Sequence, residues 1–191
     1  LLQILREDKP THMVAAFDVS SDTFRKELYE DYKSNRDKMP DSLADQIESI
    51  MEVFRLLDIP QIGIPGQEAD DIVGSFTNHP QIDEFDRVLI ISSDKDLFQF
   101  IDEKKFRVYD MMKKRIYSRK EAVEKFGVAP EYIVDYLALV GDSSDMIPGV
   151  AGIGPKWAAK LINEYGSVEK IYEHIDEIAW STQTKLKEAE R

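Results

Sequence analysis

Residues 87–91, Arg-Val-Leu-Ile-Ile, form a short apolar run that limits the folds open to this chain. Ser92, Ser93 and Asp94 end the run, and residues 97–101 begin a helical pattern. A strand that is apolar at consecutive positions is typical of a parallel strand buried on both faces. The order of strand, loop and helix therefore predicts an α/β fold with a mainly parallel sheet flanked by helices.

Other segments complete this layout. Residues 12–18 form a second apolar run that ends in Asp18, and residues 59–64 predict a short strand closed by Pro65 and Gly66. Residues 21–41 predict a helix that enters a mobile, solvated loop. A hairpin is expected from residues 106–109 and 115–117, on either side of a basic turn. Helices are expected at 42–57, from 69 onward, and at 119–126, 130–140, 155–164, 168–174 and 182–190.

The chain after Ser118 is expected to be wholly helical. The predicted organisation is thus an α/β core over residues 1–117 and a helical subdomain over residues 118–191. Residues 1–5 read as the tail of an amphipathic helix, so we expect the chain to begin inside a longer protein. No apolar run approaches the ~20 residues needed to cross a bilayer. With no secretion signal either, we expect a cytoplasmic protein without a membrane partner.

Composition narrows the chemistry to oxygen ligands. The chain has no cysteine, which excludes disulfides, thiolate catalysis and sulfur-bound zinc. Its three histidines, His12, His79 and His174, stand in no metal-ligand spacing. The net charge is −12, which by itself argues against nucleic acid as a partner. That objection weakens if the carboxylates gather around divalent cations, because bound cations reverse the local field.

Acidic residues cluster at four places where a strand or a short loop gives way to a helix. In a parallel α/β sheet the carboxyl ends of the strands meet at one edge, where such folds bind ligands. Carboxylates that converge there would repel one another strongly unless cations were bound. Two Mg²⁺ or Mn²⁺ ions would relieve the repulsion, and such a pair is usual for phosphodiester hydrolysis. The residues are Asp18; Glu68, Asp70 and Asp71; Asp94 and Asp96; Asp142 and Asp145.

Each cluster taken alone also has a structural interpretation. Acidic residues in the first turn of a helix are favoured by the helix dipole and by capping, without any metal. The residues alone therefore leave both interpretations open for a single cluster, and only their joint position favours the metal site.

A glycine-rich turn is predicted to open a helix near residue 155. Such a turn frees backbone N–H groups that can hold a phosphate at the positive end of the helix. Helix, glycine turn and helix follow in order over about 135–165, which predicts a helix-hairpin-helix that binds the DNA backbone. The alternative is an ordinary turn between helices. The candidate DNA-binding residues are Gly149, Gly152, Ile153, Gly154, Lys156 and Lys160.

These motifs resemble the 5′ nuclease domain of bacterial DNA polymerase I and its flap endonuclease relatives, including polymerase-free ones. The resemblance covers almost the whole chain and rests on the order and spacing of its motifs. The matching residues include Phe17-Asp18, Phe24-Arg25, Tyr32-Lys33, Pro65-Gly66, Glu68, Asp70-Asp71, Ser93-Asp94, Asp96, Asp135, Gly141-Asp142, Asp145 and the glycine turn.

The resemblance implies a PIN-like or 5′ nuclease-like fold and a role for each motif. Asp18, Glu68, Asp70 and Asp71 would hold one metal ion, and Asp94, Asp96, Asp142 and Asp145 a second. Residues 21–41 would form the arch or clamp that a 5′ single strand passes through. There Lys33, Arg25 and Arg36 would contact the scissile phosphate, and Tyr32 would stack on a base. A solvated helix face is the alternative for residues 21–41. The resemblance also allows K⁺ at the helix-hairpin-helix.

The sequence departs from the family pattern in three places. The family carries a further metal-binding aspartate on a strand that precedes the first residue of this chain. Met146 stands where the family usually has asparagine, and Ser93 where glycine or alanine is common. Both positions adjoin predicted metal ligands, so they could tune the geometry of the site.

We expect a two-metal, structure-specific 5′ nuclease that acts on DNA ends, flaps, nicked or branched duplexes in replication and repair. We expect a monomer, and the resemblance allows a polymerase domain in the same polypeptide. One alternative is a DNA-structure-binding fragment with little activity, because the first strand and its aspartate are missing. Another is a different carboxylate-rich Mg²⁺ enzyme, such as a phosphatase or an RNA nuclease of related fold. The glycine turn argues against this alternative, because a small-molecule phosphatase does not need it.

Overall fold

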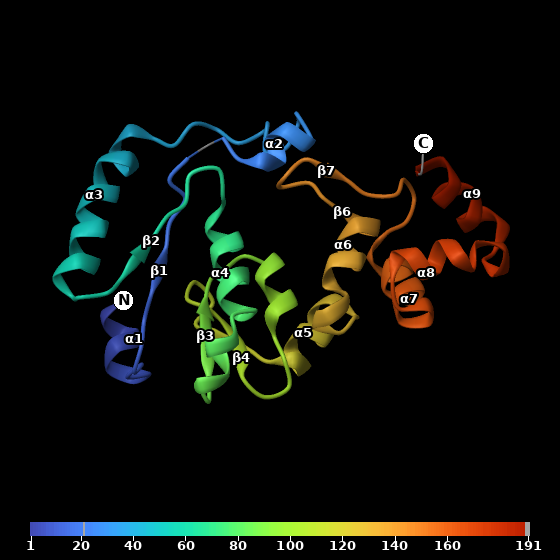
Figure 1. The fold of residues 1–191 in the computed structure, drawn as a ribbon. Helices are drawn as coiled ribbons and strands as arrows, with labels where there is room; N and C mark the ends of the chain where they lie inside the picture. Colours follow the sequence, from blue (N-terminus) through green and yellow to red (C-terminus); the bar gives the residue numbers. More distant parts are fainter. Residues whose placement is uncertain (21, 190–191) are drawn as a thin grey trace. The chain divides into compact units, whose positions relative to one another are not determined.

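The computed structural model describes residues 1–20 and 22–189, which form two compact units (Figure 1). The first unit consists of Leu1–Glu30 and Arg36–Phe76, and the second of Asp31–Asn35 and Thr77–Arg191. Residue 21, where the predicted arch begins, and residues 190–191, where the last predicted helix ends, lie outside the described residues. No helix within the described ranges is long and apolar enough to span a membrane.

The first unit is built around a pair of very short parallel strands. Ala15 lies opposite Gln61 and Ala16 opposite Ile62. Phe17 packs edge-on against Phe54 of the long helix, with ring centroids 5.7 Å apart. The elements are α1 (Leu2–Glu7), β1 (Ala15–Ala16), α2 (Phe24–Leu28), α3 (Asp41–Leu56), β2 (Gln61–Ile62) and α4 (Ala69–Thr77).

The strand predicted over residues 12–18 is much shorter than expected, and it is not buried on both faces. Only Ala15–Ala16 is a strand, both residues are half-buried, and Val14 is exposed. The strand predicted over 59–64 is likewise reduced to Gln61–Ile62. Among the described residues, β1 and β2 pair only with each other, and their pairing extends over two residues. A strand ends where its ladder of hydrogen bonds ends.

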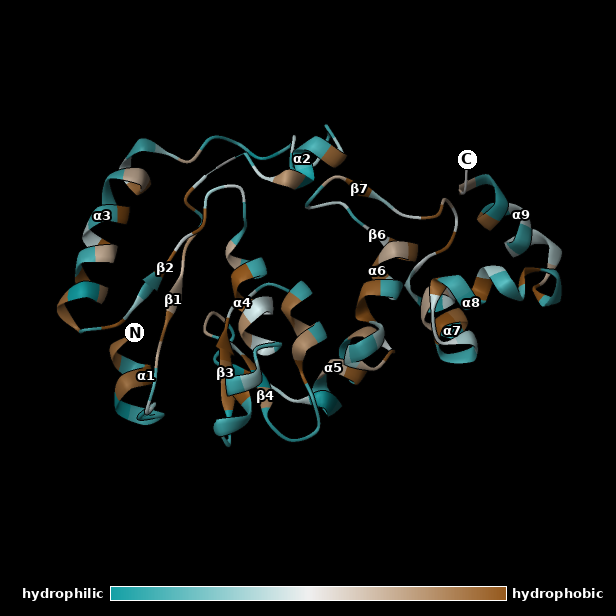
Figure 2. Cartoon of the chain, viewed as in Figure 1, coloured by the Kyte–Doolittle hydropathy of each residue, from teal (hydrophilic) through white to brown (hydrophobic). Residues whose placement is uncertain are grey.

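The second unit contains a three-stranded sheet and most of the buried core. β3 runs parallel to β4, and β4 runs antiparallel to β5, as the predicted strand and hairpin require. β3 is hydrophobic along its length (Figure 2). The strands are β3 (Val88–Ile91), β4 (Phe106–Asp110), β5 (Arg115–Tyr117), β6 (Gly141–Asp142) and β7 (Ile147–Pro148).

Helices pack against this sheet through a cluster of aromatic rings. Phe98, only 1% exposed, contacts Tyr117 and Phe126 at ring-centroid distances of 4.8 and 5.5 Å. The edge-on geometry is the one that aromatic quadrupoles favour. The helices are η1 (Pro80–Glu84), η2 (Asp96–Phe100), α5 (Arg119–Phe126), η3 (Pro130–Tyr132), α6 (Ile133–Val140), α7 (Pro155–Tyr165), α8 (Val168–Glu173), η4 (Ile175–Glu177) and α9 (Trp180–Ala189).

The expectation that the chain is wholly helical after Ser118 is wrong at one place. A two-residue antiparallel hairpin, β6 and β7, lies between α6 and α7. Gly141 ends α6 with φ 77° and ψ 176°, a conformation that is essentially restricted to glycine. The segment expected to start an α-helix at residue 97 is the 3₁₀-helix η2. Both deviations occur next to predicted metal ligands.

Candidate metal centre and DNA-binding hairpin

Three of the predicted metal ligands converge in the second unit. Asp96 begins η2, Asp142 lies in β6, and Asp145 follows in the β6–β7 loop. One carboxylate oxygen from each lies within 4.8 Å of the other two. Asp142 and Asp145 are only 7% and 8% exposed. We call these three residues the acidic trio.

The surroundings of Asp96 suit a bound cation. Its Oδ1 is buried and has no hydrogen-bond partner among the described residues. Burial, followed by the charges of Asp94 and Asp142, raises the pKa of Asp96 to about 6. A buried carboxylate oxygen without a hydrogen-bond donor is costly, and a hard divalent cation would satisfy it. The trio therefore fits such an ion.

Asp94, the fourth member of the predicted second set, has a different position. It is exposed, and its Oδ1 accepts the backbone N–H of Asp96 at 2.9 Å. This contact shapes the turn that presents Asp96. Asp94 thus adds negative charge beside the trio without joining it.

Two lysines face the acidic trio. Lys95 Nζ lies 2.8 Å from Asp142 Oδ1, and Lys33 Nζ lies 3.9 Å from Asp145 Oδ2. Burial alone would raise the pKa of Asp142. Lys95 and the N–H and hydroxyl donors of Ser144 outweigh that effect, so the pKa lies below its ordinary value.

The segment Asp31–Asn35 contains two predicted arch residues, Tyr32 and Lys33, that contact Asp145 of the acidic trio. Tyr32 is 5% exposed, and its hydroxyl donates to Asp145 Oδ2 at 3.3 Å. Lys33 has φ 55°, and its backbone N–H donates to Asp145 O at 3.0 Å. Base stacking by Tyr32 stays a prediction that requires the ring to leave this buried position.

The other predicted metal set gathers at the start of α4 in the first unit. Asp18 Oδ1 accepts the N–H of Ala69 at 2.6 Å, so the end of the β1 segment reaches the helix. Asp71 receives a bidentate pair from Arg25 at 2.7 and 2.8 Å. Arg25 also lies 3.8 Å from Glu68. Arg25, predicted to contact a phosphate, is thus placed among predicted metal ligands.

Two further predicted residues complete the first unit. Asp70 is half-buried in the first turn of α4, and Arg36 is exposed. The members of each predicted metal set therefore belong to one unit. The assembly of the two sets into one two-metal site stays a prediction.

The glycine turn is held by a close backbone crossing. A Cβ added to Gly141 would lie 2.3 Å from Gly149 N, and one added to Gly149 would lie 2.3 Å from the carbonyl carbon of Val140. Real side chains do not tolerate such contacts. Gly141 and Gly149 are thus required by the structure, and the crossing fixes the path from α6 into the turn.

The predicted DNA-binding residues of the turn fall into two groups. Ile153 is 5% exposed, so its side chain anchors the turn from within. Gly154 caps α7, with Pro155 at its first position, while Lys156 and Lys160 are exposed. Lys160 Nζ lies 4.8 Å above the Trp157 ring. This arrangement presents a helix N-terminus and two cations to solvent, as a phosphate-binding turn requires.

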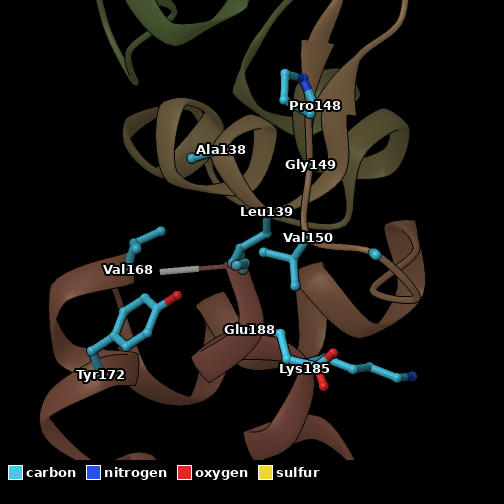
Figure 3. Close-up of a pocket in the computed structure, with 11 residues that line it drawn as sticks. Ala138, Leu139, Pro148, Gly149, Val150, Val168, Tyr172, Lys185 and Glu188 are labelled. Atoms are coloured by element: carbon cyan, nitrogen blue, oxygen red, sulfur yellow. The ribbon is translucent and has the colours of Figure 1, made fainter. Parts of the chain in front are cut away.

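A hollow of about 410 Å³ adjoins the same turn (Figure 3). It lies between α6, the glycine turn, α8 and α9, and Lys185 and Glu188 lie on its α9 side. Lys185 Nζ donates to Gly152 O at 3.0 Å. The carbonyl of Gly152 therefore already has a positively charged partner.

Sequence reasoning missed Lys95, Lys185 and Asp110. Lys95 stands between two predicted ligands, and that position was a usable signal. Asp110 is 2% exposed, and its Oδ1 accepts a hydrogen bond from Ser93 Oγ at 3.0 Å. This bond gives a partner to Ser93, one of the residues that depart from the family pattern. A hydrogen bond from the backbone N–H of Lys113 holds the pKa of Asp110 at about 2. Nothing in the sequence pairs Ser93 with Asp110, because the contact depends on the register of β3 and β4.

Family models match the whole chain in two parts. The model for the 5′-3′ exonuclease N-terminal resolvase-like domain matches residues 1–127, and that for the 5′-3′ exonuclease C-terminal SAM fold matches residues 128–191. The chain belongs to the 5′-3′ exonuclease family. This confirms the resemblance inferred from the motifs and the predicted fold class, an α/β core followed by a helical subdomain.

Individual relatives of this chain support its assignment to the 5′-3′ exonuclease family. A 5′-3′ exonuclease from Aquifex aeolicus is 40% identical over 171 residues, covering 90% of this chain and 58% of the relative. A DNA polymerase I from Caldicellulosiruptor bescii is 40% identical over 191 residues, covering 97% of this chain. The chain thus spans less than two thirds of the first relative and 22% of the polymerase.

A solved structure supports the fold. The T5 D15 protein, crystallised with metal ions, matches with a TM-score of 0.84 and 25% identity. The match covers all of this chain and 75% of the T5 protein.

Proposed function

We propose that this chain hydrolyses phosphodiester bonds at 5′ ends or 5′ flaps of DNA, as a divalent-metal-dependent nuclease of replication and repair. The observation that carries the proposal is the acidic trio, in which three carboxylates converge and Asp96 Oδ1 is buried without a donor. Membership of the 5′-3′ exonuclease family supports the reaction class.

The acidic trio, with Asp94 beside it, would hold one Mg²⁺ or Mn²⁺ ion. Asp18, Glu68, Asp70 and Asp71 would hold a second. When bound, such ions lower the pKa of a water and stabilise the leaving oxygen of the phosphodiester. The T5 D15 protein crystallises with metal ions, which supports a metal role without identifying the ion.

The cationic side chains would position the DNA. Lys33 and Arg25 already lie beside predicted ligands, where their charge can offset that of a phosphate. Arg36 would contribute from the arch, and Tyr32 would stack on a base once it left Asp145. Lys156 and Lys160 at the glycine turn would hold backbone phosphates of the duplex beyond the cut.

A monovalent cation such as K⁺ at the glycine turn would have to share Gly152 O with Lys185. We therefore assign part of the positive charge of this turn to Lys185. The residues at the turn fit K⁺ less well than the acidic trio fits a divalent ion.

The wider setting belongs to the same proposal. Residues 1–117 would form the nuclease core, and residues 118–191 the DNA-binding subdomain that lends Asp142 and Asp145 to the metal site. The protein would act as a monomer in the cytoplasm. A polymerase domain would follow where the parent protein is a DNA polymerase I, as in the Caldicellulosiruptor relative.

Cleavage assays test the proposal. Wild type, Asp145→Asn and the control Asp83→Asn are incubated with labelled 5′-flap DNA, flap RNA and a small phosphate ester, in Mg²⁺ or EDTA. Asp83 is an exposed aspartate outside the acidic trio. We expect flap DNA cleavage only with Mg²⁺, reduced at least about 100-fold in Asp145→Asn and unchanged in Asp83→Asn.

Two results would overturn it. If wild type binds flap DNA by fluorescence anisotropy but does not cut it, the chain is a DNA-structure-binding fragment. If the phosphate ester is the preferred substrate, the chain is a different carboxylate-rich enzyme.

A further inference from the structure

Lys95 makes a close ion pair with the acidic trio. Its Nζ lies 2.8 Å from Asp142 Oδ1, whereas Lys33 Nζ lies 3.9 Å from Asp145. Asp142 is almost fully buried, and a buried carboxylate needs a counter-charge or a proton. The ammonium of Lys95, at hydrogen-bond distance from Asp142 Oδ1, is that counter-charge.

The position of Lys95 allows the ammonium to leave. The residue lies between Asp94 and Asp96 at the start of η2, and its side chain is 35% exposed. A lysine side chain has a flexible four-carbon stem, and its ammonium is strongly hydrated in water. Turning the ammonium away from Asp142 therefore needs no movement of the backbone.

The pair also occupies an oxygen that a cation would need. Asp142 Oδ1 already accepts the N–H of Ser144 at 3.0 Å, besides the Lys95 ammonium. A divalent cation that bound the trio through this carboxylate would meet a positive charge within a few ångströms. Both cations cannot occupy this position at low cost.

We propose that Lys95 is an exchangeable counter-ion of the acidic trio. It neutralises Asp142 while no divalent cation is bound, and it turns to solvent when one binds. The proposal rests on the proposed function, because it assumes that the trio holds a cation. It makes Lys95 a positioning residue that lowers cation affinity and becomes available to a DNA phosphate only in the loaded site.

Amine labelling tests the exchange directly. The chain is treated with an acetylating reagent in EDTA and in Mn²⁺, and the modification of each lysine is measured by mass spectrometry. Lys105, which is ion-paired to exposed Asp83 at 3.0 Å, serves as the internal control. We expect Mn²⁺ to increase the labelling rate of Lys95 at least about threefold and to leave that of Lys105 unchanged.

Calorimetric titration with Mn²⁺ gives the second measurement. We expect Lys95→Met to bind Mn²⁺ about tenfold more tightly than wild type, because a competing positive charge is removed. Lys95→Arg should retain the wild-type affinity, and Lys105→Met, which removes the same charge elsewhere, should show no change. Circular dichroism of each variant verifies folding.

The outcomes separate this inference from the proposed function. If Mn²⁺ binds the wild type but Lys95 labelling and Lys95→Met affinity do not change, the counter-ion role is wrong and the nuclease proposal stands. Weaker binding by Lys95→Met would also overturn the counter-ion role. If Mn²⁺ does not bind the wild type and flap DNA is not cut, both proposals fail.

Discussion

Replacing Asp96 by asparagine should stabilise the metal-free protein at neutral pH. Asparagine has nearly the same shape as aspartate, and it carries no charge at any pH. In the folded chain, burial and the neighbouring carboxylates Asp94 and Asp142 raise the pKa of Asp96 from 3.8 to about 6. A carboxylate whose pKa is raised in this way lowers the stability of the folded state whenever it is ionised.

The size of the effect follows from the pKa. A rise from 3.8 to about 6 corresponds to about 3 kcal/mol if it is fully expressed. Asp96 is only half-buried, and solvent screening reduces the figure to on the order of 1–2 kcal/mol. For a chain of this length, that is roughly 3–6 °C in melting temperature.

The sign depends on pH. Because the folded state holds the Asp96 proton more tightly than the unfolded state, the contribution is fully present below pH 3.8. It is lost as pH rises through about 6. Wild type and Asp96→Asn should therefore differ little near pH 4 and differ most above pH 7. The difference between the two proteins isolates Asp96 from other titrating groups.

Thermal denaturation in EDTA between pH 4 and pH 8 is the assay, with Asp83→Asn as the exposed control. Saturating Mn²⁺ should then stabilise the wild type more than Asp96→Asn, because the variant lacks one anionic ligand. If Asp96→Asn is less stable than wild type at pH 7.5 in EDTA, the reasoning about the acidic trio is refuted.

Four further substitutions have expected outcomes. Met146 has φ 59°, a conformation that asparagine tolerates better, so Met146→Asn should raise the free energy of unfolding by about 0.5–1 kcal/mol in urea titrations; a loss would contradict this. Gly141→Ala should lower the free energy of unfolding by about 2 kcal/mol or more, whereas Gly154→Ala should be tolerated because the space around its Cβ is open. Equal effects of the two substitutions would contradict the close backbone contact between Gly141 and Gly149. Lys185→Met should weaken the binding of duplex DNA about threefold in anisotropy assays and make that binding more dependent on K⁺. Unchanged binding would show that the charge of Lys185 does not contribute to DNA binding at the turn.

The fold class followed from the sequence because it depends on local patterns. The apolar run 87–91 and the helical spacing at 42–57 correspond to β3 and α3 within one residue at each end. The parallel direction of the β1–β2 and β3–β4 pairs agrees with the expected mainly parallel arrangement, and β4–β5 is the expected hairpin. In such segments the spacing of the apolar residues by itself indicates a helix or a strand.

The strand lengths could not be predicted because they depend on partners. Residues 12–18 are apolar enough for a long strand, yet only Ala15–Ala16 pairs with β2. The β6–β7 hairpin was missed because Gly141 can end a helix in several ways, and the choice depends on its crossing with Gly149. Pairing and crossing are tertiary effects that override local pattern.

The candidate site was predictable in its residue types but not in its internal contacts. Carboxylates at the ends of strands and in short loops identified Asp96, Asp142 and Asp145, and the structure brings these three together. The ion pairs of Lys95 and Arg25 depend on side-chain conformations that no sequence pattern specifies. Met146 has a positive φ, a backbone conformation in which asparagine is enriched, which is consistent with the asparagine that the family resemblance implies at this position.

Anomalous diffraction from crystals soaked in Mn²⁺ tests the central claim most directly. We expect a peak about 2.0–2.2 Å from oxygens of Asp96, Asp142 and Asp145, with Lys95 turned away from Asp142. A map in which Mn²⁺ binds elsewhere, while Lys95 still contacts Asp142 and Asp96 Oδ1 has no ligand, would contradict it.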